Sequence, residues 1–301
     1  PPASSNPFRR KVRNRELGNE HSMENRNQYF TAQVSVADCV CEIRMNDVPV
    51  LEIKGGETMS VEVPLNQCVQ SGINTLSFIL SLAGGDNFSE IAWCEAIIYS
   101  RLTGSPREER VQIGGMIFSG EDRLGGKTGL EQSPDYADNT PTISQVSERV
   151  IQARRLVRLE TPFPRWVWLS SEIIADTPQT RAALIFAYRQ FWEQLNLKNV
   201  GEVRRLTAAK ARELAAAYYI TEADAHDRIE FQQHMADPDL TLHPFSEDGL
   251  RLEVFGNKRL ARLVDANGDS PVIFVMTDRS LAFYMNMVYC NTAGDGWLQI
   301  R

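Results

Sequence analysis

The sequence is poor in the residues and motifs that usually carry metal or nucleophilic chemistry. It has five cysteines and four histidines in 301 residues, and no two cysteines show CxxC or CxxxC spacing. It contains neither a Gly-x-Gly-x-x-Gly loop nor a Gly-x-Ser-x-Gly nucleophile elbow, and Gly126-Lys127-Thr128 lacks the earlier glycine that a phosphate loop requires. These absences exclude the enzyme classes that such motifs define. We predict no metal site and no cofactor.

Long apolar runs and an excess of basic residues are also missing. No run approaches the roughly 20 apolar residues that span a bilayer, and no signal-peptide pattern is present. We therefore predict no membrane span and a cytoplasmic location, or a periplasmic one if a signal peptide has been removed. The chain has 32 Lys and Arg against 39 Asp and Glu, a formal net charge of −7. This balance argues against a nucleic-acid partner, because neutralising phosphates requires surplus cations.

The composition that is present, 43% hydrophobic and 24% charged residues, is that of a globular protein long enough for two domains. A basic run at residues 9–15 lies in a stretch without strand or helix pattern, and Met23 comes shortly before the first strand-like residues. We expect residues 1–27 to be a disordered tail or a non-native upstream segment. A basic interaction arm is the alternative.

Residues 28–172 show the alternating pattern of β-strands. The turn residues Asn46-Asp47 and Gly72-Ile73-Asn74 lie between short apolar runs, and a change of the buried face near Asp38 indicates a bulge. We predict an immunoglobulin-like all-β sandwich with a long Gly- and Pro-rich loop at residues 103–142. Residues 165–169 are expected to form a further strand. Cys39 and Cys41 share one strand face and are expected to be buried free thiols.

Residues 176–301 change to a helix-first pattern. Thr177-Pro178 is a helix start signal, and apolar residues then recur at helical spacing to Asn196. Further helices are expected at residues 207–219 and 221–235, the second with a Thr221 and Asp224 capping box. Strand patterns follow from residue 240 to residue 300. This order predicts an α+β domain with its helices on one face of a curved antiparallel sheet.

This second part resembles the cystatin-like, nuclear-transport-factor-like superfamily, whose members fold as a cone. The resemblance covers residues 176–301 and lies in the helix ending Phe191-Trp192-Glu193-Gln194-Leu195, the hairpin at residues 255–263 and the closing residues 294–301. The whole chain is similar to a group of uncharacterised bacterial proteins with an Asn-Asp-Val-Pro-Val sandwich, a Pro-x-Trp-x-Trp connector and this cone. That resemblance implies an immunity or accessory role beside polymorphic toxins or contractile secretion systems.

The sharpest candidates for catalysis are Glu230, His234 and His243. Glu230 and His234 are four residues apart on one expected helix face, and His243 could approach from the following strand. Such a set could transfer protons inside a cone cavity. The alternative is that these are solvated polar residues at a helix end, and we favour it.

Trp166 and Trp168 are the candidates for binding. At positions i and i+2 of a strand, both rings would leave the same face, where they could form a platform for a partner protein or a sugar. Packing between the two domains is the competing interpretation, and we favour it.

The sequence therefore favours a noncatalytic two-domain protein that binds another protein and carries an acidic surface for a basic partner. A small-molecule enzyme or ligand carrier that uses the cone cavity is the alternative, with His234 or His243 as the proton-transfer group. A carbohydrate-binding protein is a third possibility, which requires Trp166 and Trp168 to be exposed.

Overall fold

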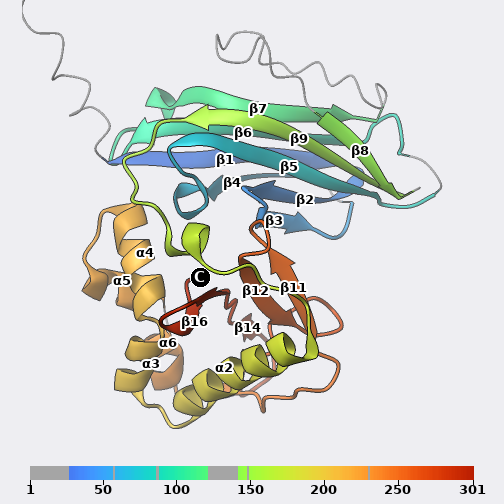
Figure 1. Cartoon of the computed structure of the whole chain (residues 1–301). Coiled ribbons are helices and arrows are strands. Elements are labelled where there is room, and N and C mark those ends of the chain that lie inside the picture. Colours follow the sequence, from blue (N-terminus) through green and yellow to red (C-terminus); the bar gives the residue numbers. More distant parts are fainter. Residues whose placement is uncertain (1–26, 57, 86–87, 121–141, 148, 230) are drawn as a thin grey trace, which may run out of the picture.

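The computed structural model describes residues 27–301 except residues 57, 86–87, 121–141, 148 and 230. Almost all of the expected tail at residues 1–27 lies outside the described residues. The described residues form sixteen strands and five α-helices, a β-rich architecture in two parts. Figure 1 shows one part built of long strands and a second part that combines helices with shorter strands.

The first part consists of two antiparallel sheets. Its strands are β1 (Gln28–Ala37), β2 (Cys39–Met45), β3 (Val48–Ile53), β4 (Met59–Pro64), β5 (Gly72–Leu82), β6 (Trp93–Leu102), β7 (Val111–Ser119), β8 (Thr142–Ser147) and β9 (Val150–Leu159). The strand orders are β4-β1-β6-β7 and β3-β2-β5-β9-β8. Strand β7 lies inside the segment 103–142 that the sequence analysis assigns to a loop, while residues 121–141 lie outside the described residues.

The expected bulge at Asp38 is a change of sheet. Asp38 has a positive φ of 51° and separates β1, in one sheet, from β2, in the other. The buried face changes at this position because Val36 and Cys39 contribute to a shared core from two different sheets. A bulge within one strand and a crossover to another sheet both interrupt the alternation of buried and exposed residues, so the sequence alone does not distinguish them.

The predicted turn at Asn46-Asp47 lies against the start of β5, where Ile73 and Asn74 belong to the strand and not to the predicted turn. Asn46 and Asp47 both have positive φ, the conformation of a tight β-hairpin turn between β2 and β3. The side chain of Asn46 donates to Asn74 Oδ1 at 2.7 Å and accepts from the Thr75 amide at 2.9 Å. Both asparagine side chains are buried. This polar network fixes the β2–β3 hairpin against the start of β5.

The second part contains α2 (Pro178–Asn196), α3 (Val200–Leu206), α4 (Ala208–Tyr218), α5 (Glu222–Arg228), α6 (Phe231–Ala236), β10 (Leu240–Leu242), β11 (Arg251–Phe255), β12 (Leu260–Val264), β13 (Ile273–Met276), β14 (Ala282–Tyr284), β15 (Tyr289–Thr292) and β16 (Gly296–Gln299). Thr177 caps α2 by accepting from the Thr180 amide at 3.1 Å, as its sequence predicts. The capping box of Thr221 and Asp224 is also confirmed.

Two expectations for this part are wrong. The helix expected at residues 221–235 is divided into α5 and α6. The expected single curved sheet is two sheets, β10-β13-β14 and β11-β12-β15-β16. The chain between residues 281 and 289 contributes β14 to the first sheet and the first residue of β15 to the second. Local periodicity identifies extended segments but does not determine which strands pair.

The two parts share an apolar core. The core of the first two sheets continues into the second part through Ala217 of α4, Leu260 of β12 and Ile300, each of them 0% exposed. A separate core fills the second part and includes Tyr188 and Phe191 of α2. The two parts therefore meet across a packed apolar contact rather than a hydrated gap.

One buried asparagine connects the two parts by hydrogen bonds. Asn66, in the short 3-10 helix η1 (Asn66–Cys68), accepts from the Phe30 amide at 2.7 Å and donates to the Ala217 carbonyl at 2.6 Å. That carbonyl belongs to the last turn of α4, where no intrahelical donor is available. Tyr219, which ends the helix in a left-handed conformation, donates its hydroxyl to the Gln28 carbonyl at 2.9 Å. The C-terminal end of α4 is thus capped by the first part.

A buried carboxylate lies in the same contact region. Glu213 of α4 is 5% exposed and accepts from the Val167 amide at 2.9 Å, while its Oε2 has no hydrogen-bond partner among the described residues. Burial raises the pKa of Glu213, an effect that nearby Arg301 and the Val167 amide oppose. Arg301 in turn donates from Nη1 to Cys68 Sγ at 2.9 Å and lies over the Trp168 ring.

Removing the Asn66 side chain, which connects the two parts, should lower the stability of the whole protein. Asn66→Ala leaves the Phe30 amide and the Ala217 carbonyl buried without their partner, and we expect the free energy of unfolding to fall by about 2–4 kcal/mol. Urea unfolding followed by tryptophan fluorescence measures this change. The exposed Asn267→Ala is the matched control and should change stability by less than about 0.5 kcal/mol. Equal stability of the two variants would contradict the role of Asn66.

Glu213 should make stability depend on pH. Because its folded-state pKa is raised above the ordinary value of 4.5, the native state holds this proton more tightly, and stability falls as pH rises from about 4.5 through the folded pKa. Glu213→Gln keeps an acceptor for the Val167 amide and removes the charge. The variant should gain stability relative to the native protein as pH rises through this window, whereas the exposed Glu160→Gln should not. Thermal unfolding between pH 4 and 8 measures the difference, and parallel curves would contradict it.

Candidate functional site

The histidines that the sequence analysis selects occupy different environments. His234 in α6 is half-buried, with its ring centroid 5.5 Å from that of Phe274 and 5.2 Å from that of Phe283. His243 follows β10, is exposed, and has Nδ1 at 3.1 Å from the Pro244 carbonyl. Glu230 lies outside the described residues. Neither histidine lines the two cavities described below, so a proton-transfer set stays a prediction.

The tryptophan pair is buried, which contradicts the exposed platform. Residues 165–169 do not form the expected strand, because Trp168 lies in the 3-10 helix η4 (Val167–Ser170) and Trp166 immediately precedes it. Each tryptophan is 1% exposed, and both belong to the core that the two parts share. Trp166 donates from Nε1 to the Val69 carbonyl at 2.7 Å. These rings pack between the parts and are not available to a sugar or a partner protein.

One lysine in the second part has an unusual environment. The Nζ of Lys210 in α4 lies 5.4 Å from the centroid of the Phe231 ring, and burial lowers the pKa of Lys210 to about 8. The lowered pKa favours the neutral form of this amine in comparison with an exposed lysine. The sequence gives no signal for it, because Lys210 stands in an ordinary Ala- and Arg-rich helix.

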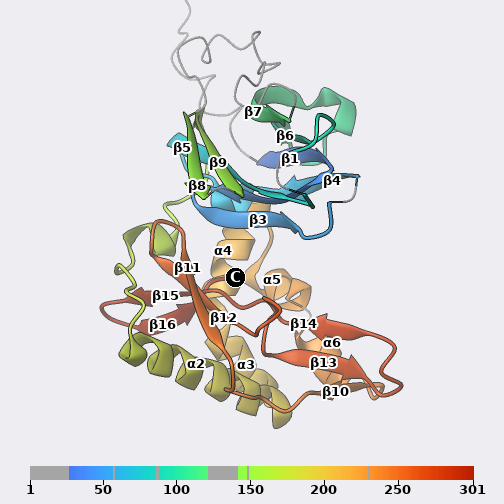
Figure 2. The same cartoon turned by 90° about the vertical axis from the view of Figure 1, so that its right-hand side faces the viewer.

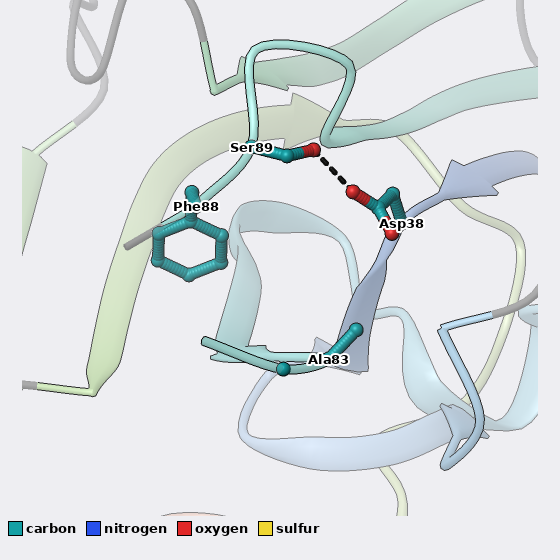
Figure 3. Close-up of a pocket in the computed structure, with 5 residues that line it drawn as sticks. Asp38, Ala83, Phe88 and Ser89 are labelled. Carbon is teal, nitrogen blue, oxygen red and sulfur yellow. Dashed lines mark hydrogen bonds between the residues drawn. The ribbon is translucent and has the colours of Figure 1, made fainter. Parts of the chain in front are cut away.

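A cavity of about 270 Å³ opens at the end of the first part, lined by Asp38, Ala83, Gly84, Phe88 and Ser89. Figure 3 shows the Ser89 hydroxyl donating to the Asp38 carboxylate above the Phe88 ring. A serine nucleophile needs a base such as an imidazole to take its proton. No histidine is among the residues that line this cavity.

The second cavity, of about 230 Å³, lies between the two parts. Its walls are the β2–β3 hairpin and the β11–β12 hairpin, and its lining comprises Glu42, Arg44, Pro49, Glu52, Glu253, Val254, Phe255 and Arg262. In Figure 2, β3 lies directly above β11 and β12. We refer to this space as the hairpin cleft.

Contacts between the two parts close the hairpin cleft at both ends. At one end the turns of the two hairpins touch: the Gly256 amide donates to the Asp47 carbonyl at 2.9 Å, and the Asn257 amide donates to Asp47 Oδ2 at 2.9 Å. At the other end Lys54 donates to the Asn267 carbonyl at 3.1 Å, with the Asp269 carboxylate 3.9 Å away. The spacing of the walls is therefore fixed by residues of both parts.

The charges on the cleft walls are unequally paired. Arg44 binds Glu42 at 2.9 Å and Asp47 at 2.8 Å, while Arg262 binds Glu253 at 2.7 Å. Burial disfavours the charged form of Arg44, but the hydrogen bonds from Arg44 to Glu42 and Asp47 outweigh this effect and raise the pKa of Arg44. Glu52 is exposed and makes no ion pair with the described residues. The cleft therefore has one carboxylate with no cation of its own.

The unpaired carboxylate faces a second one across the hairpin. Glu42 and Glu52 are directly opposite in the register of β2 and β3. Like charges in this relation repel, and they destabilise a hairpin unless a cation lies between or beside them. The sequence alone does not single out these residues, because the pairing of Glu42 with Glu52 becomes visible only when the register is known.

Among the described residues, no group of three or more His, Cys, Asp or Glu side chains is arranged to hold a metal ion. No helix in the described part of the chain is long and apolar enough to cross a membrane. Comparisons with protein-family models, curated proteins and solved structures find no significant match to this chain. Function is therefore inferred from the geometry of the cleft.

Removing the carboxylate that joins the two turns should loosen the closed end of the cleft. Asp47→Ala loses the bonds to Arg44 and to the Asn257 amide, and we expect a loss of about 1–2 kcal/mol in the free energy of unfolding, reduced from the buried value by partial exposure. Asp47→Asn keeps an oxygen acceptor for the Asn257 amide and should lose about half as much. Guanidinium unfolding measures both variants, and an unchanged Asp47→Ala stability would contradict the contact.

Proposed function

We propose that this chain is a noncatalytic protein-binding protein whose hairpin cleft receives a lysine or arginine side chain of a basic partner. The observation that carries the proposal is the unpaired Glu52 opposite Glu42 on a wall of the charged cleft between the two parts. An incoming cation between these carboxylates would relieve their repulsion. Arg44 already pairs with Glu42 and Asp47, and Arg262 pairs with Glu253, so neither supplies a cation for Glu52.

The overall charge supports a basic partner. Residues 1–27 contain six basic and three acidic residues, so residues 28–301 have a formal net charge of −10 within the total of −7. A field of this sign accelerates encounter with a basic protein and disfavours acidic ones. An immunity factor against a basic toxin, or an accessory protein of a secretion system, is the biological role that we propose for such a binder.

The finer fold assignments are part of this proposal. The two packed antiparallel sheets of the first part support an immunoglobulin-like sandwich. A helical layer followed by strands supports a relationship of the second part to the cystatin-like, nuclear-transport-factor-like cone, although its strands form two sheets. Fold alone does not determine function, so the cleft remains the basis of the argument.

A small-molecule carrier or enzyme is the second candidate, and Lys210 is the observation that favours it. An amine with a pKa of about 8 could react with a carbonyl compound as a nucleophile. The described cavities do not include Lys210 among their lining residues, which is why we place protein binding first.

Affinity purification from cells that express the protein naturally tests the proposal. The native chain should capture one basic protein in stoichiometric amount. Glu52→Lys should reduce that capture at least about tenfold, equivalent to 1.4 kcal/mol, because it places a cation where the partner's cation would bind. Glu193→Lys, an exposed charge reversal on α2, is the matched control and should retain the partner.

Two results would count against the proposal. One is an equal yield of every co-purified protein from the native chain and Glu52→Lys. The other is capture that Glu52→Lys and Glu193→Lys reduce to the same extent, because this would show that net charge alone governs binding.

A further inference from the structure

Strand β14 is an uncovered edge of the small sheet β10-β13-β14. Within the described residues it pairs only with β13, in the register Ile273 with Tyr284, Phe274 with Phe283 and Val275 with Ala282. All three residues of β14 are exposed. Figure 2 shows this sheet projecting from the side of the second part.

The backbone of β14 has hydrogen-bonding groups directed away from β13. The Met276 amide donates to the Leu281 carbonyl at 3.0 Å, and the Met285 amide donates to the Val272 carbonyl at 2.9 Å. Along an antiparallel pair, residues that bond to the neighbouring strand alternate with residues whose backbone groups point away from it. Leu281 and Met285 bond to the β13 side, so Phe283, midway between them, also directs its backbone toward β13. The N–H and C=O groups of Ala282 and the N–H group of Tyr284 therefore point to the open side, whereas the Tyr284 carbonyl accepts from the Asn286 amide at 3.1 Å.

The side chains beside this edge are apolar. Leu281 is 58% exposed, Phe283 37% and Tyr284 44%. Proteins usually protect an exposed edge with lysine, proline, a bulge or a covering segment, because an unprotected edge pairs with other strands. The sequence Leu281-Ala282-Phe283-Tyr284 contains neither lysine nor proline. Edges of this kind are used to add a strand from a partner protein.

The charges at the end of this sheet indicate what kind of strand would fit. Asp237, Asp239 and Asp278 are exposed there, against a single exposed Arg279. Asp239 lies beside the β13–β14 turn, because the Thr277 amide donates to its carbonyl at 2.8 Å. A second copy of the chain would bring the same acidic groups together, so charge favours a basic segment over self-association.

We propose that the open edge of β14 binds an extended segment of a partner protein, with alternating apolar residues flanked by lysine or arginine. The segment would pair with the outward N–H and C=O groups of Ala282 and the outward N–H of Tyr284, and would cover the exposed side chains of Leu281 and Phe283. This proposal concerns a surface separate from the hairpin cleft and does not depend on it.

A synthetic peptide tests this proposal directly on the full chain. The fluorescently labelled peptide KKVTVTVKK should bind with a dissociation constant on the order of 10–100 µM, and EEVTVTVEE should bind at least about tenfold more weakly. Ala282→Pro removes the outward N–H without removing a bond to β13 and should weaken KKVTVTVKK binding at least about tenfold. Phe283→Ala, which keeps the backbone intact, should weaken it at least about threefold.

Controls separate this edge from other surfaces. Phe186→Ala removes an exposed aromatic ring from α2 and should leave peptide binding unchanged, as should Glu52→Lys in the hairpin cleft. Hydrogen exchange should show new protection of the Ala282 and Tyr284 amides when the peptide is bound. Absence of binding at about 1 mM peptide, or protection at a different strand edge, would overturn the proposal whatever happens at the cleft.

Discussion

The hydrogen bond from Asn66 to the Ala217 carbonyl is the interaction on which the relative position of the two parts depends. The Asn66 side chain supplies a donor to a carbonyl at the C-terminal end of α4, and the Phe30 amide of the first part holds this side chain in place. A helix end that is buried without a partner would be costly, so α4 is most stable when it is docked. The apolar core around Ala217 then excludes water from this bond and strengthens it.

The hairpin cleft is a consequence of that fixed arrangement. Two hairpins from different parts face each other, and their turns meet because Asn46 and Asp47 adopt left-handed conformations that direct the Asp47 carbonyl and carboxylate toward Gly256 and Asn257. The buried asparagine network behind this turn prevents it from relaxing. A site formed between two packed units is as rigid as their contact, and rigidity reduces the entropic cost of binding.

The sequence predicts the local features of this fold better than its long-range ones. The cap at Thr177 and the turn at Asn46 follow from residue chemistry within a few positions, and both are present. The change of sheet at Asp38 and the pairing that isolates Glu52 depend on segments far apart in the chain. Local periodicity contains no information on such pairings, so the cleft could not have been predicted.

Native-state hydrogen exchange of two amides is the most direct test that the two parts form one cooperative unit. The Phe30 amide, bonded to Asn66, reports on the first part, and the Leu263 amide, bonded to the Tyr188 hydroxyl, reports on the second. If the connection is as we describe, both amides exchange only through global opening, with free energies that agree within about 1 kcal/mol. Exchange of Leu263 through an opening several kcal/mol easier, while Phe30 stays protected, would contradict this account.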